Sequence, residues 1–189
     1  KVSFNRPYAL SQNPLAAHGN GAGGFLTGIQ AGWEYNMVRW IERNGYDVTY
    51  STDIDTHVES ALWERHRAWL SVGHDEYWSW EMRAHVEQAR EHMGLGFFSA
   101  NVCYWQIRLE SSQITGHPYR TVVAYKDAAL QEDPYAVDDD PAYDRLVTAR
   151  WRDAPVHLPE ESFIGVMYDS DPVDADIVLA AGGHWALSG

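Results

Sequence analysis

The sequence has very little cysteine, with Cys103 the one thiol among 189 residues. A single thiol excludes a disulfide within the chain and any metal site built from several cysteines. A nucleophilic cysteine needs an activating base and a tight turn of small residues. Val102 and Tyr104 flank this thiol instead, and no local motif supplies a histidine. The sequence therefore favours a buried, unreactive thiol, with a cysteine amidase as a distant alternative.

Basic charge is also scarce, since 14 Lys and Arg stand against 27 Asp and Glu and give a net charge of −13. This balance argues against binding to nucleic acid or to an anionic membrane, because both need a basic face on the protein. No stretch approaches the roughly 20 apolar residues of a membrane span, and no signal peptide is recognisable. We therefore expect a small-molecule ligand and a cytoplasmic location.

Several common site motifs are missing. The sequence contains no G-x-S-x-G, H-E-x-x-H or C-x-x-C motif. The glycine-rich stretch 18–24 lacks the preceding strand and following lysine of a phosphate-binding loop, so it is predicted to be a linker. His66, His85 and His92 lie among charged residues on predicted helix surfaces. A histidine-rich zinc site is therefore disfavoured, and any metal would be held by oxygens.

Large aromatic residues are abundant, with nine Trp and eleven Tyr. Such side chains dominate cores and interfaces, so they indicate either one aromatic core or a surface buried against a partner. The length suits one domain over residues 1–189, and the abrupt ends suggest a fragment of a longer polypeptide. We expect a homo- or hetero-oligomer, or contact with a neighbouring domain.

Strand and helix patterns alternate along the chain. The predicted helices are 33–44, which Gly45 ends, and 80–93, which Ser79 caps. The predicted strands are 47–51, 68–73, 95–100, 121–126, 163–168 and 177–180. Strands that alternate with helices are typical of a parallel sheet with crossover helices. The pattern predicts an α/β sandwich with a β-rich C-terminal part, in which the acidic segment 131–144 is a solvated loop or lid.

The strongest chemical signal is the run Gly73–Trp78, which reads Gly-His-Asp-Glu-Tyr-Trp where a strand ends and a helix is about to begin. Ligands of open parallel sheets bind outside the carboxyl ends of the strands, so a functional site is favoured over simple helix capping by the acidic residues. Asp53, Asp55 and His57 follow another predicted strand and could hold a metal, although a helix N-cap is the commoner role. The segment Ser99–Trp105 follows a third strand.

Four stretches together resemble one family in the same order: Trp33–Trp40, Asn44–Tyr50, Gly73–Trp78 and Gly96–Asn101. Further matches continue the resemblance at Arg120-Thr121, Tyr125–Asp127, Pro159-Glu160 and Gly165–Tyr168. The family is the C-terminal region of the N,N-dimethylformamidase large (beta) subunit and its relatives. The resemblance covers nearly all of the chain after residue 30. It implies a flavodoxin-like, class I glutamine-amidotransferase-like three-layer sandwich with a mostly parallel sheet.

The resemblance also implies a function and a cofactor. A family member is expected to hydrolyse a small amide, such as an N-substituted formamide, to formate and an amine. It would use a mononuclear non-haem iron held by two tyrosines and one glutamate. Carried over by position, these ligands are Tyr35, Tyr77 and Glu160, with Glu161 as the rival of Glu160. Phenolate and carboxylate oxygens are hard anionic donors, which suits a ferric ion.

The neighbouring polar residues then take supporting roles. Bound iron is expected to act as a Lewis acid on the amide carbonyl. His74, Asp75 and Glu76 are candidates for acid–base chemistry, and Asn101 could donate a hydrogen bond to the developing oxyanion. The alternative is a non-catalytic scaffold or ligand-binding module with the same fold, because a fold by itself does not specify a function.

Overall fold

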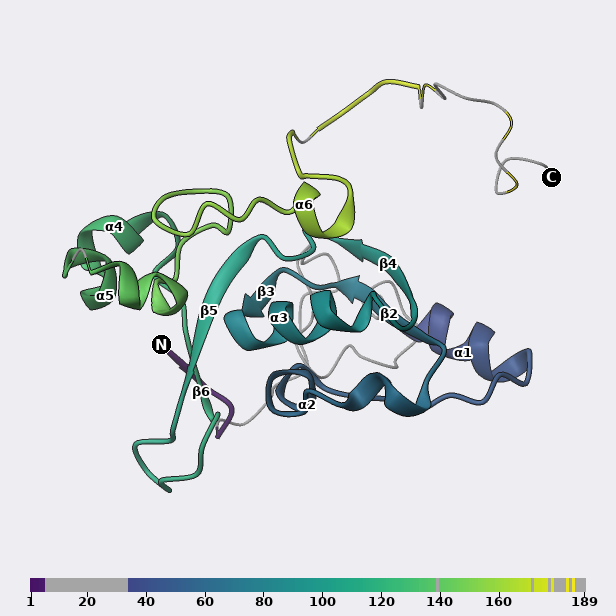
Figure 1. Ribbon diagram of the computed structural model, residues 1–189, viewed down its shortest axis with the longest axis horizontal. Helices are drawn as coiled ribbons and strands as arrows, with labels where there is room; N and C mark the ends of the chain where they lie inside the picture. Colours follow the sequence, from purple (N-terminus) through teal and green to yellow (C-terminus); the bar gives the residue numbers. More distant parts are fainter. Residues whose placement is uncertain are drawn as a thin grey trace, which may run out of the picture.

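The computed structural model describes residues 1–5, 34–138, 140–170 and 172–176, together with 178, 183 and 185 (Figure 1). Its helices and strands are β1 (Val2–Ser3), α1 (Tyr35–Arg43), α2 (Asp53–Val58), β2 (Ala68–His74), β3 (Tyr77–Ser79), α3 (Trp80–Ala89), β4 (Gly94–Ala100), β5 (Trp105–Glu110), β6 (Thr121–Val123), α4 (Ala129–Glu132), α5 (Pro134–Val137) and α6 (Glu161–Ile164). The glycine-rich stretch 18–24 lies outside the described residues.

Two small sheets form the β structure of the described part of the chain. One has the order β1-β6-β5-β3, in which β3 and β5 are parallel while β6 is antiparallel to both β5 and β1. The other is the parallel pair β2-β4. The expected flavodoxin-like, class I glutamine-amidotransferase-like sandwich with a mostly parallel sheet is therefore wrong. The fold is a mixed α/β arrangement of few, short strands.

Several elements next to the predicted site match the sequence prediction, although β3 and β5 were not predicted. Helix α3 begins after Ser79, whose hydroxyl accepts a hydrogen bond from the Met82 backbone N–H at 3.2 Å. This is the N-cap that the sequence predicted, since a serine oxygen satisfies a free N–H at the start of a helix. Helix α1 ends before Gly45, whose φ of +73° is a left-handed conformation that glycine adopts without strain. Strands β2 and β4 follow the predicted ranges to within one residue.

Of the other predicted strands, 121–126 is found in part as β6 (Thr121–Val123), whereas 47–51 and 163–168 are wrong. Residues 47–51 form no strand, and the Tyr50 hydroxyl donates to Glu42 instead. Residues 163–168 hold the end of α6, because Phe163 packs in the aromatic core and Gly165 ends the helix at φ +81°. The C-terminal part expected to be β-rich carries short helices from 129 to 164, and only part of 177–180 is described.

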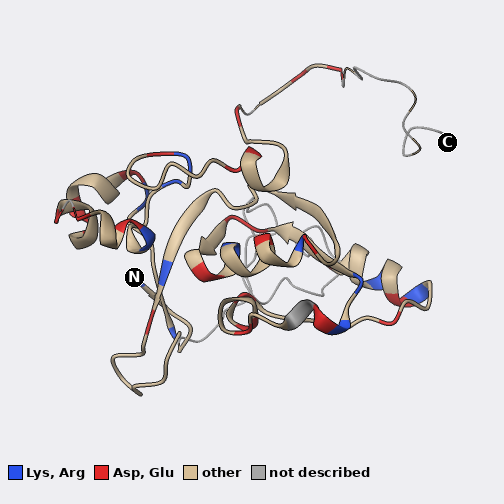
Figure 2. Cartoon of the chain, viewed as in Figure 1, with Lys and Arg blue, Asp and Glu red and all other residues tan. Residues whose placement is uncertain are grey.

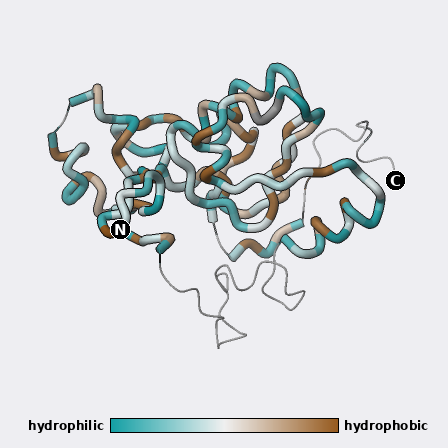
Figure 3. Tube along the Cα trace, turned by 90° about the horizontal axis from the view of Figure 1, so that it is seen from below, coloured by the Kyte–Doolittle hydropathy of each residue, from teal (hydrophilic) through white to brown (hydrophobic). Residues whose placement is uncertain are grey.

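The core is built from α3, the strand connections and the segment that precedes α6. Its largest fully buried members are Trp78 and Trp151, and Val102, Cys103 and Phe163 pack with them. The Trp78 ring meets the Phe163 ring edge to face at 5.3 Å. Hydrophobic positions are spread along the chain in short stretches (Figure 3), and no helix of the described residues is long and apolar enough to cross a membrane.

Candidate active site

The site is organised by a break between two parallel strand pairs. His74 at the end of β2 pairs with Ala100 of β4, and the next pair, Tyr77 with Trp105, begins β3 and β5. The break therefore spans 75–76 on one strand and 101–104 on the other, two residues more. This unequal break resembles a β-bulge, in which extra residues on one strand redirect its side chains, and it is called the bulge below. Asn101 and Cys103 accommodate it with left-handed φ angles of 50° and 55°.

Backbone hydrogen bonds hold the two unequal connections side by side. The Asp75 carbonyl accepts from the Cys103 N–H at 3.0 Å, and the Glu76 carbonyl accepts from the N–H groups of Tyr104 and Trp105 at 3.1 and 2.9 Å. The Asp75 N–H donates to the carbonyl of Ala100 at 3.3 Å. These bonds bring His74, Asp75 and Glu76 beside the connection that carries Asn101. Four of the residues predicted for catalysis thus lie at one bulge.

Asp75 has an unusual protonation equilibrium for an aspartate. Burial raises its pKa to about 7, and the nearby negative charge of Asp53 adds to the shift. Hydrogen bonds from Ser71 and Trp78 act in the opposite direction. The Ser71 hydroxyl donates to Asp75 Oδ2 at 2.5 Å and lies 2.8 Å from the hydroxyl of Ser99. A carboxyl that titrates near neutrality can both take up and release a proton at physiological pH.

Glu76 is fixed by two aromatic nitrogens. The Trp105 indole N–H donates to Glu76 Oε1 at 2.8 Å, and His74 Nδ1 lies 3.5 Å from Glu76 Oε2. The Glu76 carboxylate thus orients the imidazole of His74 from one side. A carboxylate paired with an imidazole is a frequent arrangement for controlling which ring nitrogen carries the proton.

Tyr77 contacts a basic side chain. The Lys126 ammonium donates to the Tyr77 hydroxyl oxygen at 2.5 Å. Its nitrogen also lies 4.8 Å from the centre of the Tyr77 ring and 5.5 Å from that of the Trp105 ring. Basic side chains are sparse along the described segments (Figure 2), so this contact places one of few positive charges beside the bulge.

Glu160 has a cation of its own. It precedes α6, is 1% exposed, and forms an ion pair with Arg152. Arg152 Nη2 lies 2.5 Å from Oε1, while its Nε lies 3.2 Å from Oε1 and 3.1 Å from Oε2. The hydrogen bond to Glu160 raises the pKa of Arg152. Glu161, the rival ligand, is exposed at the first position of α6.

The third predicted ligand, Tyr35, is the first residue of α1 and half-buried. The preceding Glu34 lies against Gly73, where a Cβ atom would come within 2.6 Å of Glu34 Oε1. The start of α1 therefore lies next to the carboxyl end of β2. Alternate residues of a strand face opposite sides, so Tyr77 points away from Trp78, which contacts Phe163 of α6.

The family model described as "N,N-dimethylformamidase beta subunit-like, C-terminal" matches residues 1–189, the whole chain. The chain belongs to this family. A search of curated proteins finds no match at the threshold applied. The resemblance inferred from the sequence is confirmed at the level of the family, which takes its name from an amide hydrolase.

In this dimethylformamidase-like domain, the predicted cluster of Asp53, Asp55 and His57 makes structural contacts. Thr52 caps α2, with Thr52 Oγ1 accepting from the Asp55 N–H at 3.2 Å and Asp55 Oδ2 accepting from the Thr52 N–H at 2.8 Å. His57 Nδ1 lies 2.7 Å from the buried Ser79 hydroxyl. Burial lowers the pKa of His57, although Glu81 acts in the opposite direction. No group of three His, Cys, Asp or Glu suited to a metal occurs in the described part of the chain.

The thiol of this domain is buried, as the sequence predicted. Cys103 is 0% exposed, and burial raises its pKa well above the usual value even though the Arg83 guanidinium lies 4.0 Å from its sulfur. A protonated thiol in the core is a poor nucleophile, because the thiolate is the reactive form. The geometry gives no support to a cysteine amidase.

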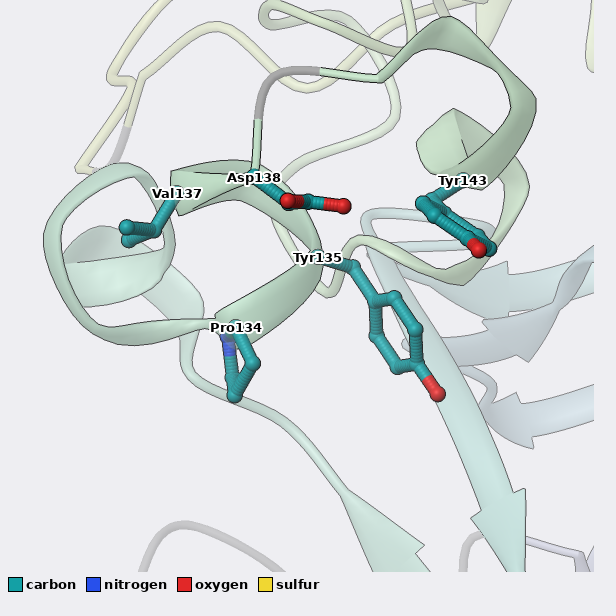
Figure 4. Close-up of a pocket in the computed structure, with 5 residues that line it drawn as sticks. All are labelled: Pro134, Tyr135, Val137, Asp138 and Tyr143. Carbon is teal, nitrogen blue, oxygen red and sulfur yellow. The ribbon is translucent and has the colours of Figure 1, made fainter.

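The acidic segment 131–144 is partly structural. Asp133 is fully buried and accepts from Thr148, with N–H and hydroxyl contacts of 2.9 and 2.8 Å, while Arg108 lies 3.3 Å away. A surface hollow opens beside it, in which Tyr135 and Tyr143 stand 5.3 Å apart between their ring centres (Figure 4). None of the predicted site residues lines this hollow.

Sequence reasoning missed the basic residues of the site. Lys126 and Arg152 contact Tyr77 and Glu160, the side chains predicted as metal ligands, and Arg150 joins them through an ion pair with Asp127. The scarcity of lysine and arginine is a signal that could have singled them out. In a chain of net charge −13, a cation beside a candidate ligand is informative.

Proposed function

We propose that this chain is the catalytic domain of an amide hydrolase that cleaves the C–N bond of a small amide, such as an N-substituted formamide. One observation carries the proposal: the bulge between the strand pairs gathers His74, Asp75 and Glu76 beside the connection of Asn101. Membership of a dimethylformamidase-like family supports the reaction class. Strained, non-glycine φ angles at the bulge also point to function, since such strain clusters at active sites.

The residues suggest how the reaction proceeds. A water molecule adds to the amide carbonyl, forming a C–O bond, and Asp75 accepts the proton that the water loses. The side chain of Asn101 donates to the oxyanion. The C–N bond then breaks, and Asp75 returns the proton to the leaving amine, so that carboxylic acid and amine are released. An aspartate with a pKa of about 7 suits both proton transfers, because its two forms are equally populated at neutral pH.

Iron held by Tyr35, Tyr77 and Glu160 is part of the proposal, and the donor chemistry fits it. A buried carboxyl group at Glu160 and a phenol oxygen at Tyr77 are hard oxygen donors. When bound, iron supplies Lewis-acid polarisation of the amide carbonyl. Glu160 would have to leave its ion pair with Arg152 to bind the metal, and the Arg152 guanidinium carbon already lies 5.2 Å from the centre of the Tyr104 ring.

A second candidate is a non-catalytic, ligand-binding module that works within a larger assembly. The observation that favours it is the Arg152–Glu160 ion pair, because Arg152 already binds the carboxylate predicted to hold the metal. The words "beta subunit-like" in the family description are consistent with assembly from several subunits.

The test is release of formate and amine from N,N-dimethylformamide by the chain loaded with ferrous or ferric iron. The proposal predicts turnover that falls by at least about 100-fold in Asp75→Asn and in Tyr77→Phe, because each loses a group that acts in the transition state. Tyr143→Phe, in the hollow away from the bulge, is the matched control and retains full activity. No formate release from iron-loaded chain, across a panel of small amides, would favour the binding module.

A further inference from the structure

Lysine is nearly absent from this chain. Of the 14 Lys and Arg residues only Lys1 and Lys126 are lysines, and Lys1 pairs with Glu110 at the surface. The other lysine, Lys126, reaches Tyr77 at the start of β3, with its ammonium 2.5 Å from the Tyr77 oxygen. Lysine is a compact point charge, whereas arginine presents a planar fork of five N–H donors. A single phenol oxygen needs one donor, which an ammonium supplies.

The backbone that carries Lys126 is held in an unusual conformation. Lys126 has a φ of 58°, a left-handed value that is strained for a residue with a Cβ. Its N–H donates to the carbonyl of Thr148 at 3.0 Å, and the N–H of Tyr125 donates to the Thr148 hydroxyl at 2.9 Å. Strained backbone of this kind persists only where surrounding bonds enforce it.

The hydrogen bonds that enforce this backbone conformation continue from Thr148 into the protein interior. Thr148 is fully buried, and both its N–H and its hydroxyl donate to Asp133 Oδ2. Asp133 is 0% exposed and is neutralised by Arg108, which also donates to the Leu146 carbonyl at 2.5 Å. A satisfied polar network in low dielectric is rigid. This network therefore fixes the point from which the lysine side chain extends toward Tyr77.

We propose that Lys126 is a positioning residue for Tyr77. Its ammonium fixes the orientation of the phenol oxygen by donating a hydrogen bond to it. The inference rests on the proposed function, because it assumes that Tyr77 belongs to the site. Two aromatic rings, those of Tyr77 and Trp105, flank the ammonium and keep it in place by cation–π attraction.

The contact can be tested without any metal. Reductive methylation with ¹³C-formaldehyde labels Lys126, the Lys1 side chain and the amino terminus, and each dimethylated amine keeps its charge and an N–H donor. Lys126→Arg identifies the Lys126 resonance by its loss. That resonance should move in Tyr77→Phe, which removes only the hydroxyl, and stay in place in Tyr143→Phe. A Lys126 resonance at the position of free dimethyl-lysine, unmoved in Tyr77→Phe, would overturn the inference.

A second readout separates positioning from a purely structural role. In iron-loaded protein, a hydrogen bond to the phenolate oxygen stabilises its electron pairs and shifts the tyrosinate-to-iron absorption to shorter wavelength. Lys126→Met should therefore move this band to longer wavelength at equal iron content, and Lys126→Arg should restore at least half of the shift. An unchanged band in Lys126→Met contradicts the inference. A wild-type chain that takes up no iron contradicts the proposed function instead, and the lysine resonance still decides the role of Lys126.

Discussion

Arg152 binds both carboxylate oxygens of Glu160, which is 1% exposed. The Glu160 carboxylate is therefore almost inaccessible to water. Arg152 is itself 22% exposed by side chain, so it forms the outer half of the contact. Breaking a buried pair by removing one partner is strongly destabilising, because the other charge is left uncompensated. The relationship therefore makes a prediction about stability that is independent of any metal.

Arg152→Met should lower the free energy of unfolding by about 3 kcal/mol, measured by urea denaturation at pH 7. The matched control is Lys1→Met, which breaks the exposed Lys1–Glu110 pair and should cost less than about 1 kcal/mol. Adding Glu160→Gln to Arg152→Met removes the stranded charge and should recover part of the loss. Equal effects of the two single variants would show that the Arg152–Glu160 pair is no stronger than a surface contact.

Asp75 should make stability depend on pH. Its pKa is raised from 3.8 to about 7 in the folded protein, so between pH 4 and 7 the folded state keeps a proton that the unfolded state loses. Stability consequently falls as pH rises through this window, by a few kcal/mol at most. Asp75→Asn lacks the titration, so its stability relative to the wild type should improve from pH 4 to pH 8. Parallel pH profiles of the two proteins in urea denaturation would refute the assigned shift.

Arg83 should stabilise the conformation of the segment before α6. Its guanidinium donates to the carbonyls of Leu158 and Pro159 at 2.6 and 3.3 Å and to the Ser162 hydroxyl at 2.9 Å. Lysine cannot reproduce this fork, so Arg83→Lys loses several of these hydrogen bonds and should cost about 3 kcal/mol. Hydrogen exchange should show faster opening at Leu158 and Phe163. The exposed Arg90→Lys is the control, and equal exchange in both variants would refute the role of Arg83.

Cys103 should be protected from alkylation. Because the thiol is fully buried with a raised pKa, iodoacetamide should react with the native chain roughly 100-fold or more slowly than with the chain in urea, since reaction requires opening of the core. Hydrolytic activity should survive prolonged exposure to the reagent. Rapid labelling accompanied by loss of activity would instead support the cysteine amidase alternative.

The sequence predicted local features better than their assembly. The Ser79 N-cap, the end of α1 at Gly45 and the strand before His74 follow from short-range patterns, and all three are found. The sheet order does not follow from such patterns. A five-residue alternation at 47–51 satisfies the strand pattern, yet a strand also needs a neighbour to bond with. The hydrophobic residue Phe163 suits a strand or a helix equally, and its aromatic contacts with Trp78 and Phe97 favour α6.

The site was predictable where its residues are adjacent in sequence. His74, Asp75 and Glu76 were identified together because they lie where a strand ends. The structure places the connection that carries the predicted Asn101 beside them. The strand β5 was missed because its buried residues include Gln106 and Arg108, which interrupt an apolar pattern. Lys126 and Arg152 were missed because their partners lie 49 and 8 residues away in sequence, and no spacing rule connects them.

The measurement that tests the account most directly is the iron content and visible spectrum of the chain after reconstitution with iron, for the wild type, Tyr77→Phe and Tyr143→Phe. The account predicts near-stoichiometric iron with a tyrosinate-to-iron band in the wild type and in Tyr143→Phe. It predicts loss of that band in Tyr77→Phe. A folded wild-type chain that binds no iron, or a band that persists unchanged in Tyr77→Phe, would contradict a metal-dependent amide hydrolase site at Tyr77.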